Sequence, residues 1–182
     1  MNLLHAPTTG QCGVLRTKAE YRLIASETIA AGALLFHLEG EETYTPTRYS
    51  VQIGPSTHID IGSDHTLQEI LDRYYWRFMN HHCEPNTVIR ERNVFTLREI
   101  QPWEEITFNY NTTEYAMAEP FSCRCGSERC QGLIRGFIGL SVEEQHRLRP
   151  WFASYLQDRV VAEVPVSALY TTPYAIHGNM EL

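Results

Sequence analysis

Short segments of alternating apolar and polar residues, separated by turn residues, fill the chain between residues 21 and 110. The alternation predicts strands within the ranges 21–40, 48–53, 58–61, 87–100 and 105–110, with turns at 30–32, 54–55 and 92–93. Strands this short and this closely spaced favour several small sheets over one large sheet. The sequence therefore predicts a mainly β fold.

Helical patterns occur in two places. Residues 66–78 bring apolar side chains to one face, which predicts a short helix. After Leu140, Ser141 and Glu144 form a capping box that predicts a helix through about Leu148. Pro150 suits the first turn of a further helix within residues 151–164, whose apolar residues would dock one face: Trp151, Tyr155, Leu156 and Val160. Residues 164–182 show no clear pattern.

Length and charge limit the classes of function. The 182 residues fit one domain with appended pieces, and a hydrophobic content of 43% supports a real core. A net charge of −7 argues against direct binding of nucleic acid, which needs a basic face, and favours a basic protein or peptide as partner. No apolar run is long enough to span a membrane, and the first ten residues do not resemble a signal peptide. We therefore expect an intracellular protein.

Cysteine spacing indicates a metal site. Three of the five cysteines fall within eight residues, in the sequence FSCRCGSERCQG. Intracellular thiols are usually reduced, so disulfides are the weaker interpretation and metal ligation the stronger one.

Three motifs follow one another along the chain: RFMNHHCEPN at 77–86, EEITFNY at 104–110 and CRCGSERCQG at 123–132. In this order and spacing they closely resemble the SET-domain protein lysine methyltransferases with a post-SET zinc segment. The resemblance covers roughly residues 13–136. It implies a β-clip fold of small sheets with a knot-like core, short helices and a C-terminal helical extension. We expect a SET domain at 1–120, a post-SET segment at 121–137 and the extension at 138–182.

The resemblance implies S-adenosylmethionine as cofactor. Asn80 and His81 would hold its methionine and adenine portions, although outside the motif Asn80 is more typical of a turn residue and His81 of a hydrogen-bonded core histidine. Further cofactor contacts are expected from Arg22, Tyr49, Tyr110, Arg124 and Leu133.

Tyr110 is the expected catalytic residue. A tyrosine hydroxyl at the end of an apolar channel would orient the lysine amine, which must be neutral to attack the methyl group. Phe108 lies two residues earlier, so on one strand both rings would face the same side and line the substrate channel. In the family, phenylalanine at this position leaves room for di- or trimethylation.

The resemblance also implies one structural zinc ion, held by Cys83 together with Cys123, Cys125 and Cys130. Four thiolates close the coordination sphere and leave no position for catalysis. Cys12 lies outside this pattern and is expected to be an ordinary thiol.

The chain departs from the family pattern in one region that bears on function. Glu20-Tyr21-Arg22 stands where the family has Gly-x-Gly, and Arg22 could reach the cofactor carboxylate. Two alternatives to protein lysine methylation stay open. One is an inactive, zinc-stabilised binding module, and the other is the same chemistry on a small amine. A histone is one candidate substrate among lysine-bearing proteins, and the C-terminal helices could form a homodimer contact or cap the substrate groove. A microbial protein of this kind would be cytoplasmic, and a eukaryotic one could be nuclear.

Overall fold

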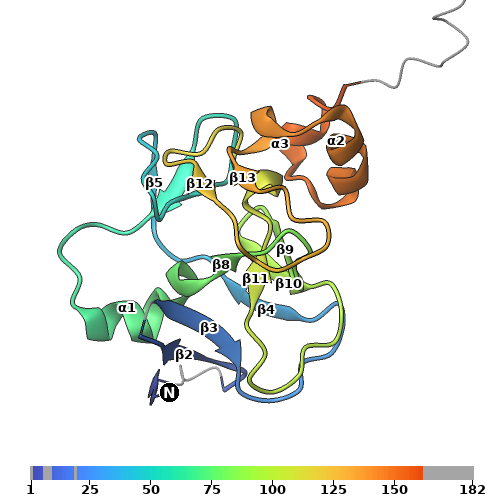
Figure 1. The fold of residues 1–182 in the computed structure, drawn as a ribbon. Coiled ribbons are helices and arrows are strands. Elements are labelled where there is room, and N and C mark those ends of the chain that lie inside the picture. Colours follow the sequence, from blue (N-terminus) through green and yellow to red (C-terminus); the bar gives the residue numbers. More distant parts are fainter. Residues whose placement is uncertain (1, 6–9, 19, 162–182) are drawn as a thin grey trace, which may run out of the picture.

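The computed structural model describes residues 2–5, 10–18 and 20–161, which form five small sheets (Figure 1). Three have three strands, in the orders β1-β2-β3, β4-β10-β9 and β5-β7-β6, and two have two strands, β8-β11 and β12-β13. Their bounds are β1 Asn2–His5, β2 Cys12–Arg16, β3 Tyr21–Ala25, β4 Leu34–His37, β5 Glu41–Thr43, β6 Val51–Gln52, β7 His58–Asp60, β8 Asn80–His81, β9 Thr87–Arg90, β10 Asn93–Thr96, β11 Thr107–Phe108, β12 Phe121–Ser122 and β13 Leu133–Ile134. The predicted mainly β fold of small sheets is confirmed.

The hairpin of β9 and β10 turns one residue earlier than predicted. Arg90 pairs with Asn93, so Glu91 and Arg92 form the loop. Glu91 adopts a φ of 56°, which gives the tight reversal that a two-residue hairpin loop requires.

The helix predicted over 66–78 is divided in two. A capping box between Thr66 and Glu69 begins α1, Leu67–Arg73, and a 3₁₀ helix, η1, covers Tyr75–Phe78. Tyr74 leaves the helical conformation between them. This break turns Trp76 into the core, where its indole N–H donates to the backbone oxygen of Glu39 at 2.9 Å.

The strand predicted over 105–110 is shorter than expected. Only β11, Thr107–Phe108, is paired as a strand, and the 3₁₀ helix η2 begins at Tyr110 and ends at Thr112. Asn109 causes the change of direction, because its side-chain oxygen accepts a hydrogen bond from the backbone N–H of Asn111 and caps η2. Tyr110 therefore projects from a turn and not from a strand.

The C-terminal region confirms one predicted helix and corrects the other. Helix α2, Val142–Leu148, begins after Ser141, whose hydroxyl accepts from the backbone of Glu144. The long helix predicted over 151–164 is wrong within the described residues: they contain η4, Arg149–Trp151, and the four-residue α3, Ser154–Gln157. Between these, Phe152 and Ala153 are extended, which lets the N–H of Ala153 donate to Thr112. Residues 162–164 lie outside the described part.

Two apolar clusters form the interior. The larger joins the first three sheets, α1 and η1, and the smaller is made of Phe137, Leu148, Phe152 and Leu156. Another 3₁₀ helix, η3 at Phe137–Gly139, leads from β13 into the smaller cluster. Figure 1 shows α2 and α3 together at one end, α1 and β2-β3 at the other, and the pair β8-β11 between them. Within the described ranges no helix has the length and apolarity to cross a membrane.

Candidate functional site

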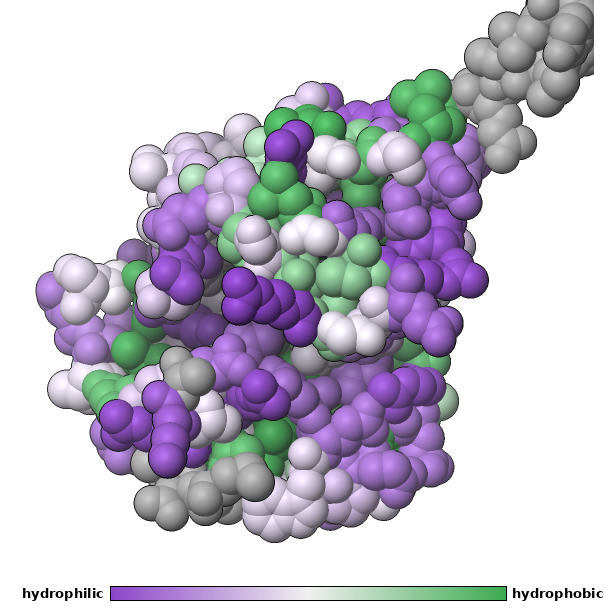
Figure 2. All heavy atoms as spheres, viewed as in Figure 1, coloured by the Kyte–Doolittle hydropathy of each residue, from purple (hydrophilic) through white to green (hydrophobic). Residues whose placement is uncertain are grey.

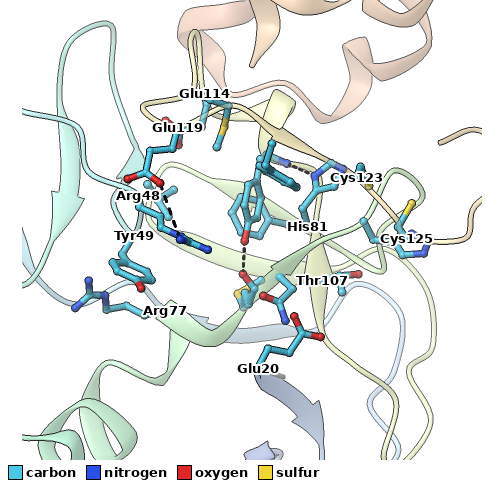
Figure 3. A pocket seen from close by; sticks show the side chains of 18 of the residues that line it. Glu20, Arg48, Tyr49, Arg77, His81, Thr107, Glu114, Glu119, Cys123 and Cys125 are labelled. Atoms are coloured by element: carbon cyan, nitrogen blue, oxygen red, sulfur yellow. Dashed lines mark hydrogen bonds and ion pairs between the residues drawn. The ribbon is translucent and has the colours of Figure 1, made fainter. Parts of the chain in front are cut away.

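A cavity of about 640 Å³ lies where β8 and β11 meet the loop before β6 and the segment leading through β12. It is lined by most of the residues predicted to bind the cofactor or substrate: Arg22, Tyr49, Asn80, His81, Phe108, Tyr110 and Arg124. Figure 2 shows mainly hydrophilic side chains across the middle of this face, and Figure 3 shows the cavity from close by. Residues far apart in the sequence are thus brought to one place.

The parallel pair β8-β11 forms the base of the site. Asn80 is in register with Thr107, and His81 with Phe108. The buried side chain of Asn86 fixes this pair, since its amide donates to the backbone oxygen of Glu105 at 2.8 Å and its oxygen accepts from the N–H of Thr107 at 2.9 Å. Two-residue strands make few backbone hydrogen bonds with each other. The Asn86 side chain therefore supplies hydrogen bonds to the backbone that a longer strand would make with its neighbour.

Asn80 is held by its amide nitrogen. This nitrogen donates to the backbone oxygen of Tyr21 at 3.1 Å and to the Glu105 carboxylate at 2.8 Å. Both N–H groups are therefore used within the protein. The side-chain oxygen of Asn80 is left as the acceptor that a ligand ammonium group requires.

A charged group occupies the position of the missing glycines. The Arg22 guanidinium donates to Glu20 at 2.6 and 2.9 Å and lies 3.3 Å from Glu105. The hydrogen bond that Arg22 donates to Glu20 raises the pKa of Arg22, with the charges of Glu105 and Glu20 adding to it against the effect of burial. Arg22 lines the cavity, so a cationic side chain lies at the position where the family has glycine and therefore no side chain.

His81 links the predicted metal ligands to the predicted catalytic residue. Its Nδ1 accepts from the backbone N–H of Tyr110 at 3.2 Å, and its Nε2 lies 3.3 Å from the sulfur of Cys83. Burial, together with the charge of His82, lowers the pKa of His81 to about 3. The ring is therefore neutral near pH 7, and with Nδ1 as acceptor its hydrogen is on Nε2 and donates to Cys83.

Aromatic rings surround the Tyr110 side chain. Its ring centroid lies 4.7 Å from Phe108, 5.2 Å from His81 and 5.9 Å from Phe121. The rings of Phe108 and Tyr110 are adjacent, as predicted, although the two residues do not share a strand. The Tyr110 hydroxyl donates to the backbone oxygen of Met79 at 2.8 Å. Burial, reinforced by the charges of Glu105 and Glu114, raises the pKa of Tyr110 well above its ordinary value.

The four predicted zinc ligands come together. The sulfur atoms of Cys83, Cys123, Cys125 and Cys130 all lie within 4.8 Å of one another, and the Cys83–Cys123 sulfur distance is 4.0 Å. Tetrahedral zinc–thiolate bonds of about 2.3 Å place the sulfur atoms about 3.8 Å apart, so the cluster fits one zinc ion. Cys12 lies apart, buried in the main core.

Backbone N–H groups around the cluster suit thiolates. The N–H of Gln131 donates to the Cys83 sulfur at 3.4 Å. Burial raises the pKa of Cys83, and it raises the pKa of Cys123 to about 11. Burial opposes ionisation of Cys125 as well, but hydrogen bonds from the backbone of Cys83 and Ser127, together with those from the side chains of Cys123 and Cys130, outweigh it and lower the pKa of Cys125 to about 6. A cation is what would hold the remaining sulfurs as thiolates.

The remaining predicted residues differ in placement. Tyr49 lines the cavity, with the Arg77 guanidinium 4.7 Å from its ring centroid. Arg124 lines it from its position between two clustered cysteines. Leu133 does not line the cavity and is 42% exposed on β13, so the structure does not bring it together with the others.

Sequence reasoning missed two residues of the cavity. Phe121 completes the aromatic wall around Tyr110, and Glu114 is a cavity-lining carboxylate only 6% exposed. One oxygen of Glu114 accepts from the N–H of Gln52 at 2.8 Å, and the other lies 3.6 Å from Nε2 of the buried His58. Both Phe121 and Glu114 flank recognised motifs, but no local pattern distinguishes them from surface residues. Arg48 and Glu119, both labelled in Figure 3, also line the cavity and form an ion pair at 4.0 Å.

Comparison with known proteins gives consistent results. Residues 20–111 match the family model described as SET domain. The chain is 30% identical to "Methyltransferase flvH" of Aspergillus flavus, over 85% of each protein. It is 32% identical to a "Histone-lysine N-methyltransferase, H3 lysine-36 specific" of Cryptococcus neoformans, over 68% of this chain but 16% of that protein.

Solved structures show weaker similarity. The structure of KRYPTONITE in complex with mCHH DNA, an H3 peptide and SAH is 25% identical, with a TM-score of 0.49 over 66% of this chain and 28% of that one. The methyltransferase domain of human SETMAR is 20% identical, with a TM-score of 0.48 over 66% of this chain and 56% of that one.

Proposed function

Since this chain belongs to the SET domain family of methyltransferases, we propose that it transfers methyl groups from S-adenosylmethionine to the ε-amine of lysine in a protein substrate. The observation that carries the proposal is the Tyr110 hydroxyl, placed in an aromatic wall of the cavity beside Asn80 and His81. We assign the SET domain to residues 1–120, the post-SET segment to 121–137 and an extension to 138–182.

Tyr110 orients the acceptor amine in this proposal. The raised pKa keeps its phenol protonated, and the hydrogen is committed to the Met79 oxygen. The phenol oxygen therefore acts as an acceptor for an amine N–H, which directs the lone pair of the amine away from the tyrosine. Such alignment supplies much of the rate of a displacement reaction.

The aromatic wall favours the neutral amine. Phe108, Tyr110 and Phe121 offer apolar surface that removes water from the lysine side chain. Desolvation lowers an amine pKa from its ordinary value of about 10.4 and so increases the fraction able to attack. After transfer, the same ring faces attract a methylammonium product. Because Phe108 brings no hydroxyl to this wall, we propose di- or trimethylation.

The cofactor site is proposed at the polar and charged residues that line the same cavity as Tyr110. S-adenosylmethionine, when bound, supplies the methyl group on a sulfonium. The Asn80 side-chain oxygen would accept from an ammonium group, and the Arg22 guanidinium would pair with a carboxylate. His81, Tyr49 and Arg124 line the same cavity and complete the proposed set. Leu133 stays outside it because it does not line the cavity.

A structural zinc ion would be held by Cys83, Cys123, Cys125 and Cys130. Four thiolates leave the ion no open position, so it would hold the post-SET segment against the cavity without entering the reaction. Through the contact of Cys83 with His81, loss of the ion would disturb the cofactor side of the site.

The acceptor is proposed to be a basic protein or peptide. The net charge of −7 and the cavity-lining Glu114 and Glu119 suit a cationic substrate. The fungal relatives named as histone-lysine methyltransferases make a histone one candidate, in which case we place the protein in the nucleus. Homodimerisation remains a second, separate proposal.

A small amine is the second candidate acceptor. The relative that matches over 85% of both chains is named only a methyltransferase, whereas this chain spans 16% of the histone-lysine enzyme. Glu114 supports this candidate too, since its carboxylate in the cavity is approached by His58 and not by an arginine among the described residues.

The test is transfer of labelled methyl groups from S-adenosylmethionine by the zinc-loaded protein. Acceptors are recombinant histones, lysine peptides, free lysine and small diamines, and Tyr110→Phe is the control. Transfer to histones or peptides that Tyr110→Phe loses supports protein lysine methylation, and transfer to the small amines alone supports the second candidate. Cofactor binding by calorimetry without transfer to any acceptor would instead indicate an inactive binding module.

A further inference from the structure

The C-terminal extension contacts the segment that carries Tyr110. We call residues 110–115, which comprise η2 and the three residues after it, the catalytic turn. The backbone N–H of Ala153 donates to the oxygen of Thr112 at 2.9 Å, and the hydroxyl of Tyr155 lies 2.6 Å from the oxygen of Thr113. Both contacts come from η4-α3, beyond the residues of the SET family match.

Tyr155 also contacts strand β6. Its hydroxyl lies 2.8 Å from the backbone oxygen of Gln52 on β6. Gln52 itself bonds the catalytic turn twice, through its N–H to the Glu114 carboxylate and through its side-chain oxygen to the N–H of Tyr115, both at 2.8 Å. The Tyr155 hydroxyl therefore lies where β6 and the catalytic turn are joined, and Val51 of β6 lines the cavity.

Residues of the catalytic turn that are joined to β6 or to Tyr155 also hydrogen-bond the backbone of Tyr110. The backbone oxygen of Tyr110 accepts from the N–H of Glu114 at 2.8 Å and from that of Thr113 at 3.2 Å. Tyr155 thus bonds the carbonyl of Thr113, and the N–H of Thr113 in turn donates to the carbonyl of Tyr110. Burial, with the charge of Glu114, raises the pKa of Tyr155, so its hydroxyl stays a donor at every pH of interest.

We propose that Tyr155 is a positioning residue, whose hydroxyl sets the separation of β6 from the catalytic turn and thereby the position of Tyr110. The proposal rests on the proposed function for the role of Tyr110. It assigns to the extension a part in the methyl-transfer site beyond covering the small apolar cluster of Phe137, Leu148, Phe152 and Leu156.

The variant is Tyr155→Phe, which keeps the ring and removes the hydroxyl. Its matched control is Tyr44→Phe, because Tyr44 is 77% exposed and does not line the cavity. We expect Tyr155→Phe to lower kcat about tenfold, since displacements well below 1 Å at a reacting group already slow transfer. The affinity for S-adenosylhomocysteine and the zinc content should stay unchanged, and Tyr44→Phe should match the wild type.

A readout that needs no activity accompanies the kinetics. In protein with ¹³C-labelled tyrosine rings, the Tyr110 resonance, assigned by its loss in Tyr110→Phe, should shift in Tyr155→Phe and not in Tyr44→Phe. An unmoved resonance would overturn the proposal even if the wild type transfers no methyl group, which would separately refute the proposed function. An equal loss of cofactor affinity and kcat would also overturn it, because Tyr155 would then support the whole site and not Tyr110.

Discussion

Replacing Asn86 with alanine is expected to destabilise the protein strongly, although Asn86 lies outside the predicted set of site residues. Its side chain is 2% exposed and bonds the N–H of Thr107 at 2.9 Å and the backbone oxygen of Glu105 at 2.8 Å. The same amide lies 3.2 Å from the carboxylate of Glu104. Alanine can make none of these bonds.

The magnitude follows from the groups left without partners. A buried donor or acceptor that loses its hydrogen bond costs about 1–3 kcal/mol, so the two backbone groups together predict a loss of about 2–6 kcal/mol. Asn93→Ala is the matched control, because the side-chain oxygen of Asn93 lies 3.1 Å from the ring of His37, which is exposed. A surface change of this kind shifts the free energy of unfolding by about 0.5 kcal/mol or less.

The assay is urea unfolding of zinc-saturated protein, followed by fluorescence, with hydrogen exchange measured at the Thr107 amide. Asn86→Ala should lower the free energy of unfolding without changing the m-value, and the Thr107 amide should exchange faster than its neighbours in β11. A loss below about 1 kcal/mol with unchanged exchange at Thr107 would refute the reasoning, because water or a shifted backbone would then replace the side chain.

Three further predictions concern the site. Chelation of zinc, or Cys130→Ser, should abolish cofactor binding in calorimetry while a zinc-replete control binds, and retained affinity would contradict the link through Cys83 and His81. Because the pKa of Tyr110 is raised above its ordinary value of 10.0, the phenol should stay protonated and kcat should not fall between about pH 9 and pH 10. The folded state then holds this proton longer than the unfolded chain, so the contribution of Tyr110 to stability is complete below pH 10 and decreases above it. Phe108→Tyr should shift the products toward monomethyl in mass spectrometry, and an unchanged distribution would exclude Phe108 as the residue that limits methylation.

The motifs allowed the sequence to predict which side chains gather, but not how the backbone brings them together. Asn80, His81 and Tyr110 meet at one cavity, as their order in the motifs implied. The turn at Asn109 was not predictable from alternation, since Thr107, Phe108 and Tyr110 fit a strand equally well. The turn forms because the Asn109 side chain accepts a hydrogen bond from the N–H of Asn111, and the alternation of apolar and polar residues does not predict such a bond.

Hydrogen bonds between residues far apart in the sequence could not be predicted from local patterns either. The helix expected after Pro150 has the right apolar spacing, but Phe152 and Ala153 are extended because Thr112, 41 positions earlier, offers a backbone acceptor. Phe121 and Glu114 became recognisable only once the fold placed them against Tyr110 and Gln52. Tertiary hydrogen bonds of this kind override weak helical preference.

A domain built from strands of two to five residues has few ladder hydrogen bonds with which to fix a catalytic side chain. This protein instead holds Tyr110 from two sides with hydrogen bonds that lie outside the strand ladders. On one side His81 accepts from the Tyr110 N–H and donates to Cys83, which connects the turn to the cysteine cluster. On the other, the backbone N–H of Glu114 donates to the backbone oxygen of Tyr110, and the Tyr155 hydroxyl donates to the backbone oxygen of the neighbouring Thr113. The backbone N–H and carbonyl of Tyr110 thus depend on segments before and after it in the chain. A substitution that removes the hydrogen bonds of either segment should therefore displace the Tyr110 phenol.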